Sequence, residues 1–477
     1  MGPMTLAFDP LQAASAALSV AGDGARTPRQ LQRIRADRLA RLLEICVARS
    51  ALYRRWLHGI DPTKAKLHDL PVAQRSELMR QFDDWITDPR IHLDDLRAFV
   101  RDPTRIAHAF AGRYIVWHSS GTSGEPGIFV QDARTMAIYD ALEALRGPWF
   151  RWAVQHPGEL ALPCNLVMIG LPHEHYASTV ATQRLRQLNP WLASRLHNVS
   201  LLQPMNDLRQ ALERLRPTVL ATFPSVALQL AEERRRGCLD VAPDEIWLGG
   251  ETLSQPTRRF IEDSFGCRVH DSYGASEFLS IASECRFHAL HLNADWIILE
   301  PIDARGHPVG RDIESDAVLL THLGNHLQPL LRYRLPDRIT LCSTPCACGS
   351  PLPVIKVQGR DDDILRLPAA RRRILSVSPL AITTIIEQRG GLLDYQLRQT
   401  SPNELVLSCA AHEAGSRARL PRAAAELAHF LAGLGAVGVR VTPSVHATPA
   451  PGAGGKVRRI VAARATAFAR AHAEPAR

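Results

Sequence analysis

From residue 165 to residue 265 the chain alternates between short apolar runs, typical of buried strands, and longer segments with helical periodicity. The strand-like runs cover residues 165–170, 218–222 and 245–248, and the helix-like segments cover 182–188, 225–236 and 255–265. Such alternation predicts a mostly parallel sheet with helices on its faces. In open sheets of this kind, ligands bind beyond the carboxyl ends of the strands. We therefore expect an α/β fold with a site at that edge.

At 477 residues the chain is too long for one compact core, and its pattern changes along its length. Residues 1–25 are rich in Ala, Gly and Ser and are expected to be loosely ordered. A large domain over residues 26–358 is expected to combine doubly wound sheets with a barrel-like section of short strands. A small α+β domain is expected over residues 359–465, followed by a tail over residues 466–477.

Composition favours an ordinary globular protein. Hydrophobic residues make up 45% and charged residues 22% of the chain, and no apolar run approaches the roughly 20 residues that span a bilayer. No basic residue precedes Arg26, so the start does not resemble a secretory signal. Nine cysteines in so long a chain do not indicate a disulfide framework. A reducing cytoplasm is therefore the expected compartment, and no membrane partner is expected.

The net charge of +9 raises the possibility of nucleic acid binding. However, only four of the 57 basic residues are lysines, namely Lys64, Lys66, Lys356 and Lys456. The arginines are interspersed with acidic residues. This pattern indicates a compositional bias towards arginine more than a binding face. We therefore do not expect a nucleic acid partner.

Residues 118–126 read His-Ser-Ser-Gly-Thr-Ser-Gly-Glu-Pro and directly follow an apolar run. The hydroxyl residues and glycines of this loop are Ser119, Ser120, Gly121, Thr122, Ser123 and Gly124. Glycines let the main chain come close to a ligand, and a nest of N–H and hydroxyl donors suits phosphate oxygens. The spacing is not that of a Walker A motif. Taken alone, the loop is equally consistent with a flexible surface loop.

Four later segments add to this loop. Residues 271–277 read Asp-Ser-Tyr-Gly-Ala-Ser-Glu, residues 332–337 Arg-Tyr-Arg-Leu-Pro-Asp, residues 359–363 Gly-Arg-Asp-Asp-Asp, and residues 454–459 Gly-Gly-Lys-Val-Arg-Arg. In order and spacing, the five segments resemble the adenylate-forming (AMP-binding) superfamily, and most closely its phenylacetate–coenzyme A ligase-like branch. The resemblance covers about residues 30 to 462.

The resemblance implies an ATP-dependent, AMP-forming acid–thiol ligase. Such an enzyme forms an acyl-adenylate from a carboxylic acid, here an aryl or small organic acid, and passes the acyl group to a thiol, usually that of coenzyme A. By resemblance, Lys456 bridges the substrate carboxylate and the α-phosphate, Glu277 binds Mg²⁺, and Asp337 accepts the ribose hydroxyls. Asp362 is then the hinge about which the small domain rotates.

Each of these residues also has a simpler interpretation. Lys456 could be a solvated surface lysine, Glu277 an acid favoured by a helix N-terminus, and Asp337 a turn residue after Pro336. The other residues that the resemblance assigns to ATP or AMP are Ser119, Ser120, Gly121, Thr122, Ser123, Gly124, Gly249, Gly250, Glu251, Asp271, Tyr273, Gly274, Ser276 and Arg360.

The acyl pocket is expected to include Tyr273, Phe223 and His175, although a lone histidine is more often a core residue than a catalytic one. Two departures from the family pattern bear on this function. Glu125 stands where the family usually has lysine, and residues 371–377 replace a segment that contains glycine. The acyl acceptor therefore stays open between coenzyme A, a carrier-protein thiol and an amine, and the reaction could also stop at adenylyl transfer.

Cysteines and histidines gather in two places, as Cys-x2-His-x2-His over residues 285–291 and as Cys-x3-Cys-x-Cys-Gly over residues 342–349. Thiolates and imidazoles in clustered pairs are typical ligands of structural zinc. By resemblance to relatives, the four ligands are Cys285, His291, Cys346 and Cys348; the alternative is a set of buried, reduced thiols. A protein of a different class, a zinc-ribbon scaffold or nucleic-acid-binding protein, remains the rival interpretation.

Overall fold

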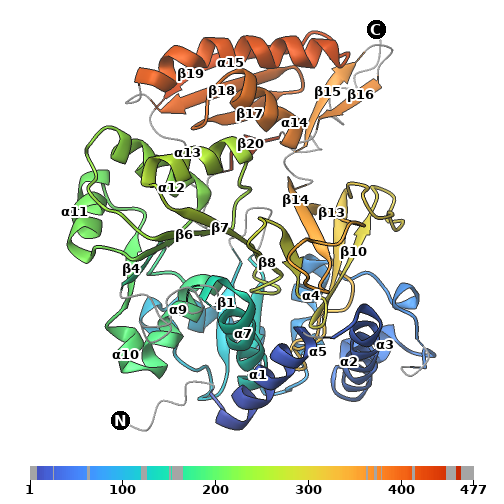
Figure 1. The fold of residues 1–477 in the computed structure, drawn as a ribbon. Helices are drawn as coiled ribbons and strands as arrows, with labels where there is room; N and C mark the ends of the chain where they lie inside the picture. Colours follow the sequence, from blue (N-terminus) through green and yellow to red (C-terminus); the bar gives the residue numbers. More distant parts are fainter. Residues whose placement is uncertain are drawn as a thin grey trace.

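The computed structural model describes residues 8–462 except for 25, 62–64, 120–125, 150–151, 153–164, 361–363, 370–372, 378, 411–413 and 447–457. Three parts can be followed in Figure 1. The N-terminal helices lie at the bottom of this view, a large sheet with its helices crosses the middle, and the C-terminal elements form a layer at the top.

A nine-stranded sheet with the order β13-β14-β9-β8-β7-β6-β5-β3-β4 is the centre of the large domain. Its strands β3 to β7 are parallel. They are β3 (Leu166–Gly170), β4 (Leu196–Ser200), β5 (Val219–Thr222), β6 (Glu245–Gly249) and β7 (Arg268–Tyr273). The helices that connect them are α9 (Ala177–Leu188), α10 (Pro190–Ala193), α11 (Met205–Leu215), α12 (Pro224–Arg235) and α13 (Gln255–Phe265). The predicted α/β fold is confirmed.

The remaining strands of this sheet are antiparallel and come from the section predicted to be barrel-like. They are β8 (Ala282–Glu284), β9 (Leu290–Leu292), β13 (Asp337–Leu341) and β14 (Val354–Arg360). A separate three-stranded sheet contains β10 (Ile297–Ile302), β11 (Ala317–His322) and β12 (Tyr333–Leu335). Part of the short-strand section therefore extends the main sheet, and part forms a second sheet beside it.

The N-terminal section is mainly helical. Its elements are α1 (Pro10–Gly24), α2 (Pro28–Arg49), α3 (Ala51–Trp56), η1 (Leu67–Asp69), α4 (Arg75–Arg80), α5 (Phe82–Trp85), α6 (Leu93–Val100), η2 (Pro103–Arg105) and α7 (Ala133–Arg146). A hairpin of β1 (Ile115–His118) and β2 (Ile128–Gln131) precedes α7. Thr27 begins α2 with a reciprocal capping box that involves Gln30.

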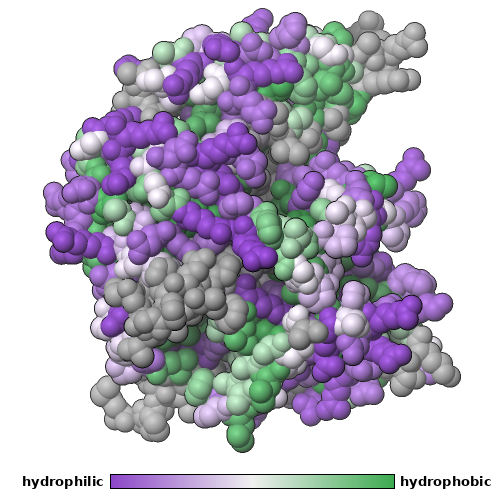
Figure 2. Space-filling view, viewed as in Figure 1, coloured by the Kyte–Doolittle hydropathy of each residue, from purple (hydrophilic) through white to green (hydrophobic). Residues whose placement is uncertain are grey.

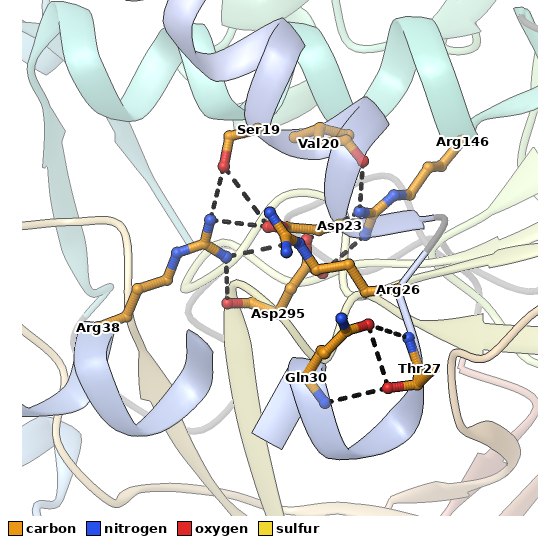
Figure 3. A network of polar contacts seen from close by, with 9 residues as sticks. All are labelled: Ser19, Val20, Asp23, Arg26, Thr27, Gln30, Arg38, Arg146 and Asp295. Atoms are coloured by element: carbon orange, nitrogen blue, oxygen red, sulfur yellow. Dashed lines mark hydrogen bonds and ion pairs between the residues drawn. The ribbon is translucent and has the colours of Figure 1, made fainter. Parts of the chain in front are cut away.

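The prediction of a loosely ordered N-terminus is wrong for α1. Ala16 and Val20 of this helix are buried in the main core, and a cluster of charges fixes it to the rest of the domain (Figure 3). Arg38 of α2 contacts Asp23 at 2.8 Å, and Arg146 of α7 contacts Asp295 at 2.7 Å. The Ala-rich composition that suggested weak order is also a strong helix former once tertiary contacts are available.

The C-terminal domain contains its own hydrophobic core. A four-stranded sheet has the order β19-β18-β17-β20, and a hairpin of β15 and β16 lies beside it. The elements are β15 (Leu365–Ala369), β16 (Arg373–Val377), α14 (Pro379–Thr384), η5 (Ile385–Arg389), β17 (Gln396–Ser401), β18 (Glu404–Ala410), α15 (Ala414–Gly433), β19 (Arg440–His446) and β20 (Ile460–Val461). Among the described residues, the buried side chains of this core run from Leu365 to Ile460, and none belongs to the cores of the large domain.

On the face drawn in Figure 2, hydrophilic residues predominate over α11, α12 and α13, and hydrophobic residues occur in smaller patches. Within the described residues, no helix combines the length and the apolar character needed to cross a membrane.

Candidate active site

Strand β1 ends at the entrance to the Ser/Thr/Gly loop. Ser119 follows β1 and closes the base of the loop through two bonds to Gly127: its N–H donates to the Gly127 carbonyl at 2.8 Å, and its Oγ accepts from the Gly127 N–H at 2.8 Å. Residues 120–125, which include Ser120, Gly121, Thr122, Ser123 and Gly124, lie outside the described residues. Ser119 and Gly127 are therefore bonded to each other at the end of the β1–β2 hairpin.

The segment after β7 lies beside β1. The indole N–H of Trp117 donates to the carbonyl of Ser276 at 2.8 Å. A Cβ atom at Gly274 would lie 2.0 Å from the carbonyl oxygen of Leu279, so this turn requires glycine at that position. The first two predicted motifs, more than 150 residues apart in sequence, therefore meet in the structure.

Glu277 is a buried carboxylate at this junction of motifs. Its Oε1 accepts a hydrogen bond from the Tyr333 hydroxyl at 2.9 Å. Burial raises the pKa of Glu277, the Tyr333 bond opposes this effect, and the like charge of Asp337 adds to it. The structure thus brings Glu277 close to the third motif. A nearby cation would stabilise the ionised form of both acids, so the two residues fit a site for a hard dication.

Asp337 begins β13 and lies opposite Arg360 of β14 in the antiparallel register. Arg360 is the last residue of β14, and the hinge candidate Asp362 lies just beyond, outside the described residues. The acid predicted to bind ribose therefore lies opposite Arg360, which precedes the predicted hinge residue by two positions in the sequence.

Asp271 and Tyr273 lie on β7, the last parallel strand. Burial and then the like charge of Glu284 raise the pKa of Asp271 to about 7. Glu284 is itself paired with Arg258 at 2.6 Å, so the positive charge of Arg258 acts on both Glu284 and Asp271. The Asp271 carboxyl is thus only partly ionised near neutral pH.

The Gly249–Gly250–Glu251 segment leaves β6 beside β7. A Cβ atom at Gly249 would lie 2.7 Å from Ser272 Oγ, and Gly250 has a φ of +78°. Both glycines are therefore required by the local backbone. Glu251 accepts bonds from the N–H of Ser225 at 2.9 Å and from its hydroxyl at 3.0 Å, so it binds the start of α12.

Two of the pocket candidates have clear surroundings. Phe223 precedes α12 as its N-cap residue. His175 is 1% exposed and packs edge-on against Phe99. Burial, followed by the charge of His118, lowers the pKa of His175 to about 4, so its imidazole is neutral near pH 7. The His175 carbonyl accepts from the N–H of His118 at 2.9 Å, which fixes this segment beside the phosphate-loop entrance.

The four predicted zinc ligands come together. Their ligand atoms all lie within 4.8 Å of one another, with Cys285 Sγ 3.6 Å from Cys346 Sγ and Cys348 Sγ 3.3 Å from His291 Nε2. A tetrahedral zinc site with the usual bond lengths has ligand separations of about 3.5–3.8 Å. The other ring nitrogen of His291 contacts the Leu352 carbonyl at 3.0 Å, which leaves Nε2 facing the thiols. This donor set fits a closed zinc site.

Sequence reasoning missed a second polar cluster, located where the two domains meet. Glu387 of η5 pairs with Arg459 at 2.6 Å and also contacts the hydroxyl of Ser254. Ser254 is the N-cap of α13 in the large domain. The only sequence signal was the place of Arg459 in the motif that contains Lys456, and Lys456 itself lies outside the described residues.

Comparison with known proteins gives a consistent result. No protein-family model matches the chain. A phenylacetate–coenzyme A ligase of Thermus thermophilus is 26% identical over 393 residues, which cover 77% of this chain and 80% of the relative. A 2-hydroxyisobutyryl-CoA ligase in its postadenylation state, bound to 2-HIB-AMP, is 19% identical with a TM-score of 0.68, covering 94% of this chain and 92% of the other. The same protein bound to 2-HIB-AMP and CoA in its thioesterification state has a TM-score of 0.56 at the same identity and coverage.

The solved structures confirm the fold of both domains, and the sequence match extends over most of the chain and of its relative. Contacts in the structure join segments of the first three motifs: Trp117 bonds to Ser276, and Glu277 lies near Asp337. The chain is therefore similar in sequence to the phenylacetate–coenzyme A ligases over most of its length, and it shares its fold with the solved 2-hydroxyisobutyryl-CoA ligase.

Proposed function

We propose that this protein is an AMP-forming acid–thiol ligase that activates a carboxylic acid with ATP and transfers the acyl group to coenzyme A. The observation that carries this proposal is the contact between segments of three motifs: Trp117, near the end of β1, bonds to Ser276, and the neighbouring buried Glu277 lies near Asp337 at the start of β13. Relatives named as coenzyme A ligases support the same activity.

In the first step, a carboxylate oxygen of the substrate attacks the α-phosphorus of ATP. A new oxygen–phosphorus bond forms, the bond to the β-phosphate bridging oxygen breaks, and pyrophosphate leaves with the electron pair. The substrate supplies the nucleophile, so the protein contributes position and charge. Lys456 would neutralise the two anions as they approach, and the Ser/Thr/Gly loop would bind the phosphates.

Glu277 would hold Mg²⁺, which screens the phosphate charges when bound. Two observations support this role: Tyr333 fixes one oxygen of the carboxyl, and a cation would lower the pKa that burial raises. Asp337 would accept hydrogen bonds from the ribose hydroxyls, which suits an ionised acid.

In the second step, the thiol releases its proton to solvent and its sulfur attacks the acyl carbonyl. The carbon–sulfur bond forms and AMP leaves as the phosphate anion. Rotation of the small domain about Asp362 would separate the two steps, since a hinge needs only a few residues to absorb large dihedral changes. A carrier-protein thiol or an amine in place of coenzyme A would use the same adenylate.

The surroundings of the pocket candidates favour an aryl or small organic acid. His175 is neutral near pH 7, and Tyr273 and Phe223 add aromatic surface. None of these three side chains supplies a charge for a second acidic group on the substrate.

We also propose that Cys285, His291, Cys346 and Cys348 hold one structural zinc ion. A reducing cytoplasmic location is the natural setting for these thiols.

ATP–pyrophosphate exchange over a panel of aryl and short-chain acids, with and without coenzyme A, tests this function. We expect exchange that depends on the acid and a thioester product only when coenzyme A is present. Exchange without a thioester would assign a different acceptor or adenylyl transfer alone. The absence of acid-dependent exchange, together with salt-sensitive binding of random duplex DNA, would instead favour the scaffold interpretation.

A further inference from the structure

The small domain contacts the start of α13 through a buried carboxylate. The side chain of Glu387 is fully buried, and it contacts the hydroxyls of Ser254 and, at 3.5 Å, Thr257. Ser254 Oγ also accepts from the Thr257 N–H at 3.2 Å as the helix cap. An anion at a helix N-terminus is favoured by the free N–H groups and the helix dipole. The contact is therefore attractive although no charge of the large domain takes part in these bonds.

Both charges of this cluster belong to the small domain. Glu387 is on η5 and Arg459 immediately precedes β20, and their 2.6 Å ion pair lies within that domain. Rotation of the small domain would remove the pair intact and break its hydrogen bonds to the neutral hydroxyls of Ser254 and Thr257, together with a weaker electrostatic attraction between Arg459 and Glu251 of the large domain. An ion pair with one charge on each domain would instead leave a buried charge without its partner, which is costly. This arrangement suits a contact that must open repeatedly.

Arg459 also connects the cluster to the segment that carries Lys456. The Arg459 carbonyl accepts from the Leu397 N–H at 2.7 Å, and the Arg458 carbonyl accepts from the Gln396 side chain at 3.0 Å. The backbone at 458–460 is therefore fixed to β17, close behind Lys456 in the sequence. Because Arg459 is bonded at the domain junction, the chain that follows Lys456 passes through that junction.

The orientation of the domains matches one state of the solved relative better than another. At equal coverage, the chain superposes on the postadenylation state with a TM-score of 0.68 and on the thioesterification state with a TM-score of 0.56. The Ser254–Glu387 contact therefore belongs to an arrangement of the postadenylation kind.

We propose that the Glu387–Arg459 pair, seated on the N-terminus of α13, is a latch that holds the small domain in the adenylation orientation and opens before acyl transfer. This inference rests on the proposed function. Glu387 and Arg459 act as positioning residues, because they set the placement of the domain and contact neither substrate in this scheme.

Ser254→Asp tests the latch. Aspartate caps a helix as well as serine does, so α13 keeps its start, but a second carboxylate then faces Glu387. We expect acid-dependent ATP–pyrophosphate exchange to fall at least about tenfold, whereas thioester formation from supplied acyl-adenylate stays within about twofold. Ser254→Asn, which caps the helix without charge, should retain exchange within about threefold.

The double variant S254D/E387Q provides a rescue, because the new carboxylate can then pair with Arg459. We expect it to recover most of the exchange activity. Small-angle scattering adds a readout that needs no turnover: S254D should change the profile relative to wild type and S254N. An unchanged profile for S254D, or equal loss in both half-reactions, would overturn the latch. If wild type shows no exchange with any acid, the proposed function fails, while the scattering comparison still decides whether the contact holds the domains.

Discussion

Two buried clusters of arginine and acid have opposite designs. At the N-terminus, Asp23 and Asp295 bind Arg38 and Arg146, and the four side chains come from α1, the loop before β10, α2 and α7 (Figure 3). At the domain junction, Glu387 and Arg459 both belong to the small domain, and their hydrogen bonds to the large domain go to the hydroxyl groups of Ser254 and Thr257. The first cluster joins separate elements through opposite charges, and the second keeps its opposite charges on one side.

This difference shows that ion pairs of similar chemistry can stabilise either a permanent contact or an interface that opens. Separating α1 from the large domain would take Asp23 away from Arg38 and leave Arg38 with its longer ion-pair contact of 3.9 Å to Asp295. Separating the small domain leaves the Glu387–Arg459 pair whole. The distribution of charges between moving parts, more than the number of ion pairs, therefore decides whether an interface can open.

The largest expected effect is on the N-terminal cluster. Asp295→Ala removes a fully buried carboxylate that binds Arg146 at 2.7 and 2.8 Å. We expect the free energy of unfolding to fall by about 3–5 kcal/mol, because both arginines lose a buried partner. Urea denaturation measures this change. Asp94→Ala is the control: Asp94 pairs with Arg97 at 2.9 Å but is 92% exposed, so the loss should stay below about 1 kcal/mol. Similar losses in both variants would show that the cluster does not fix α1.

The next effect concerns the chemistry that the latch is proposed to position. Lys456→Ala should lower acid-dependent pyrophosphate exchange by about 10²–10³-fold, because one preorganised charge at the phosphorus is lost. Thioester formation from supplied acyl-adenylate should remain largely intact, as measured in single-turnover reactions. Equal loss in both half-reactions would remove Lys456 from its assigned role and the segment after it from the latch argument.

The opposite pattern is expected when the hinge is locked. Asp362→Pro fixes φ near −65°, so the small domain should stay where the latch holds it. We expect exchange to persist and acyl transfer to fall about 100-fold, since misplaced groups lose their effective concentration. Steady-state thioester formation reports this change. Turnover that survives the substitution would mean that the junction need not open, and the contrast between the two clusters would lose its functional meaning.

The smallest expected effect concerns a third cluster of side chains, the four candidate zinc ligands. Purified protein should contain close to one zinc per chain, and Cys346→Ser should lose it. We expect a loss of about 2 kcal/mol in stability, or roughly 3 °C in melting temperature for a domain of more than about 300 residues, with little change in catalysis. Metal analysis and thermal melting measure the two changes. A zinc-free wild type and an unaltered melting curve for the variant would assign these residues to ordinary thiol packing.

Local patterns were sufficient for elements whose ends carry their own signals. The predicted helix at 255–265 is α13, which Ser254 caps, Pro256 starts and Gly266 ends with a left-handed residue. The four candidate zinc ligands, which the resemblance to relatives implied, come together in the structure. These features depend on residues near one another in sequence or on a pattern shared with relatives.

Long-range pairing could not be predicted from local patterns. The order of α1 depends on Arg38, Arg146 and Asp295, the last of which is 272 residues away from Asp23 (295 − 23). The latch joins Ser254 to Glu387, which are 133 residues apart. Glu387 follows Ile385 and Ile386 and resembles the polar edge of an amphipathic helix. Only the docked domain shows that its carboxylate is buried.

The separate cores of the two domains also bear on how such a protein can be rebuilt or diverge. No described side chain belongs to both cores, so substitutions inside one leave the packing of the other untouched. We therefore expect that the C-terminal domain of a relative could replace this one, with a breakpoint between β14 and β15. The restriction lies at the junction: a transplanted domain must bring residues equivalent to Glu387 and Arg459 that match the helix cap at Ser254 of its new host.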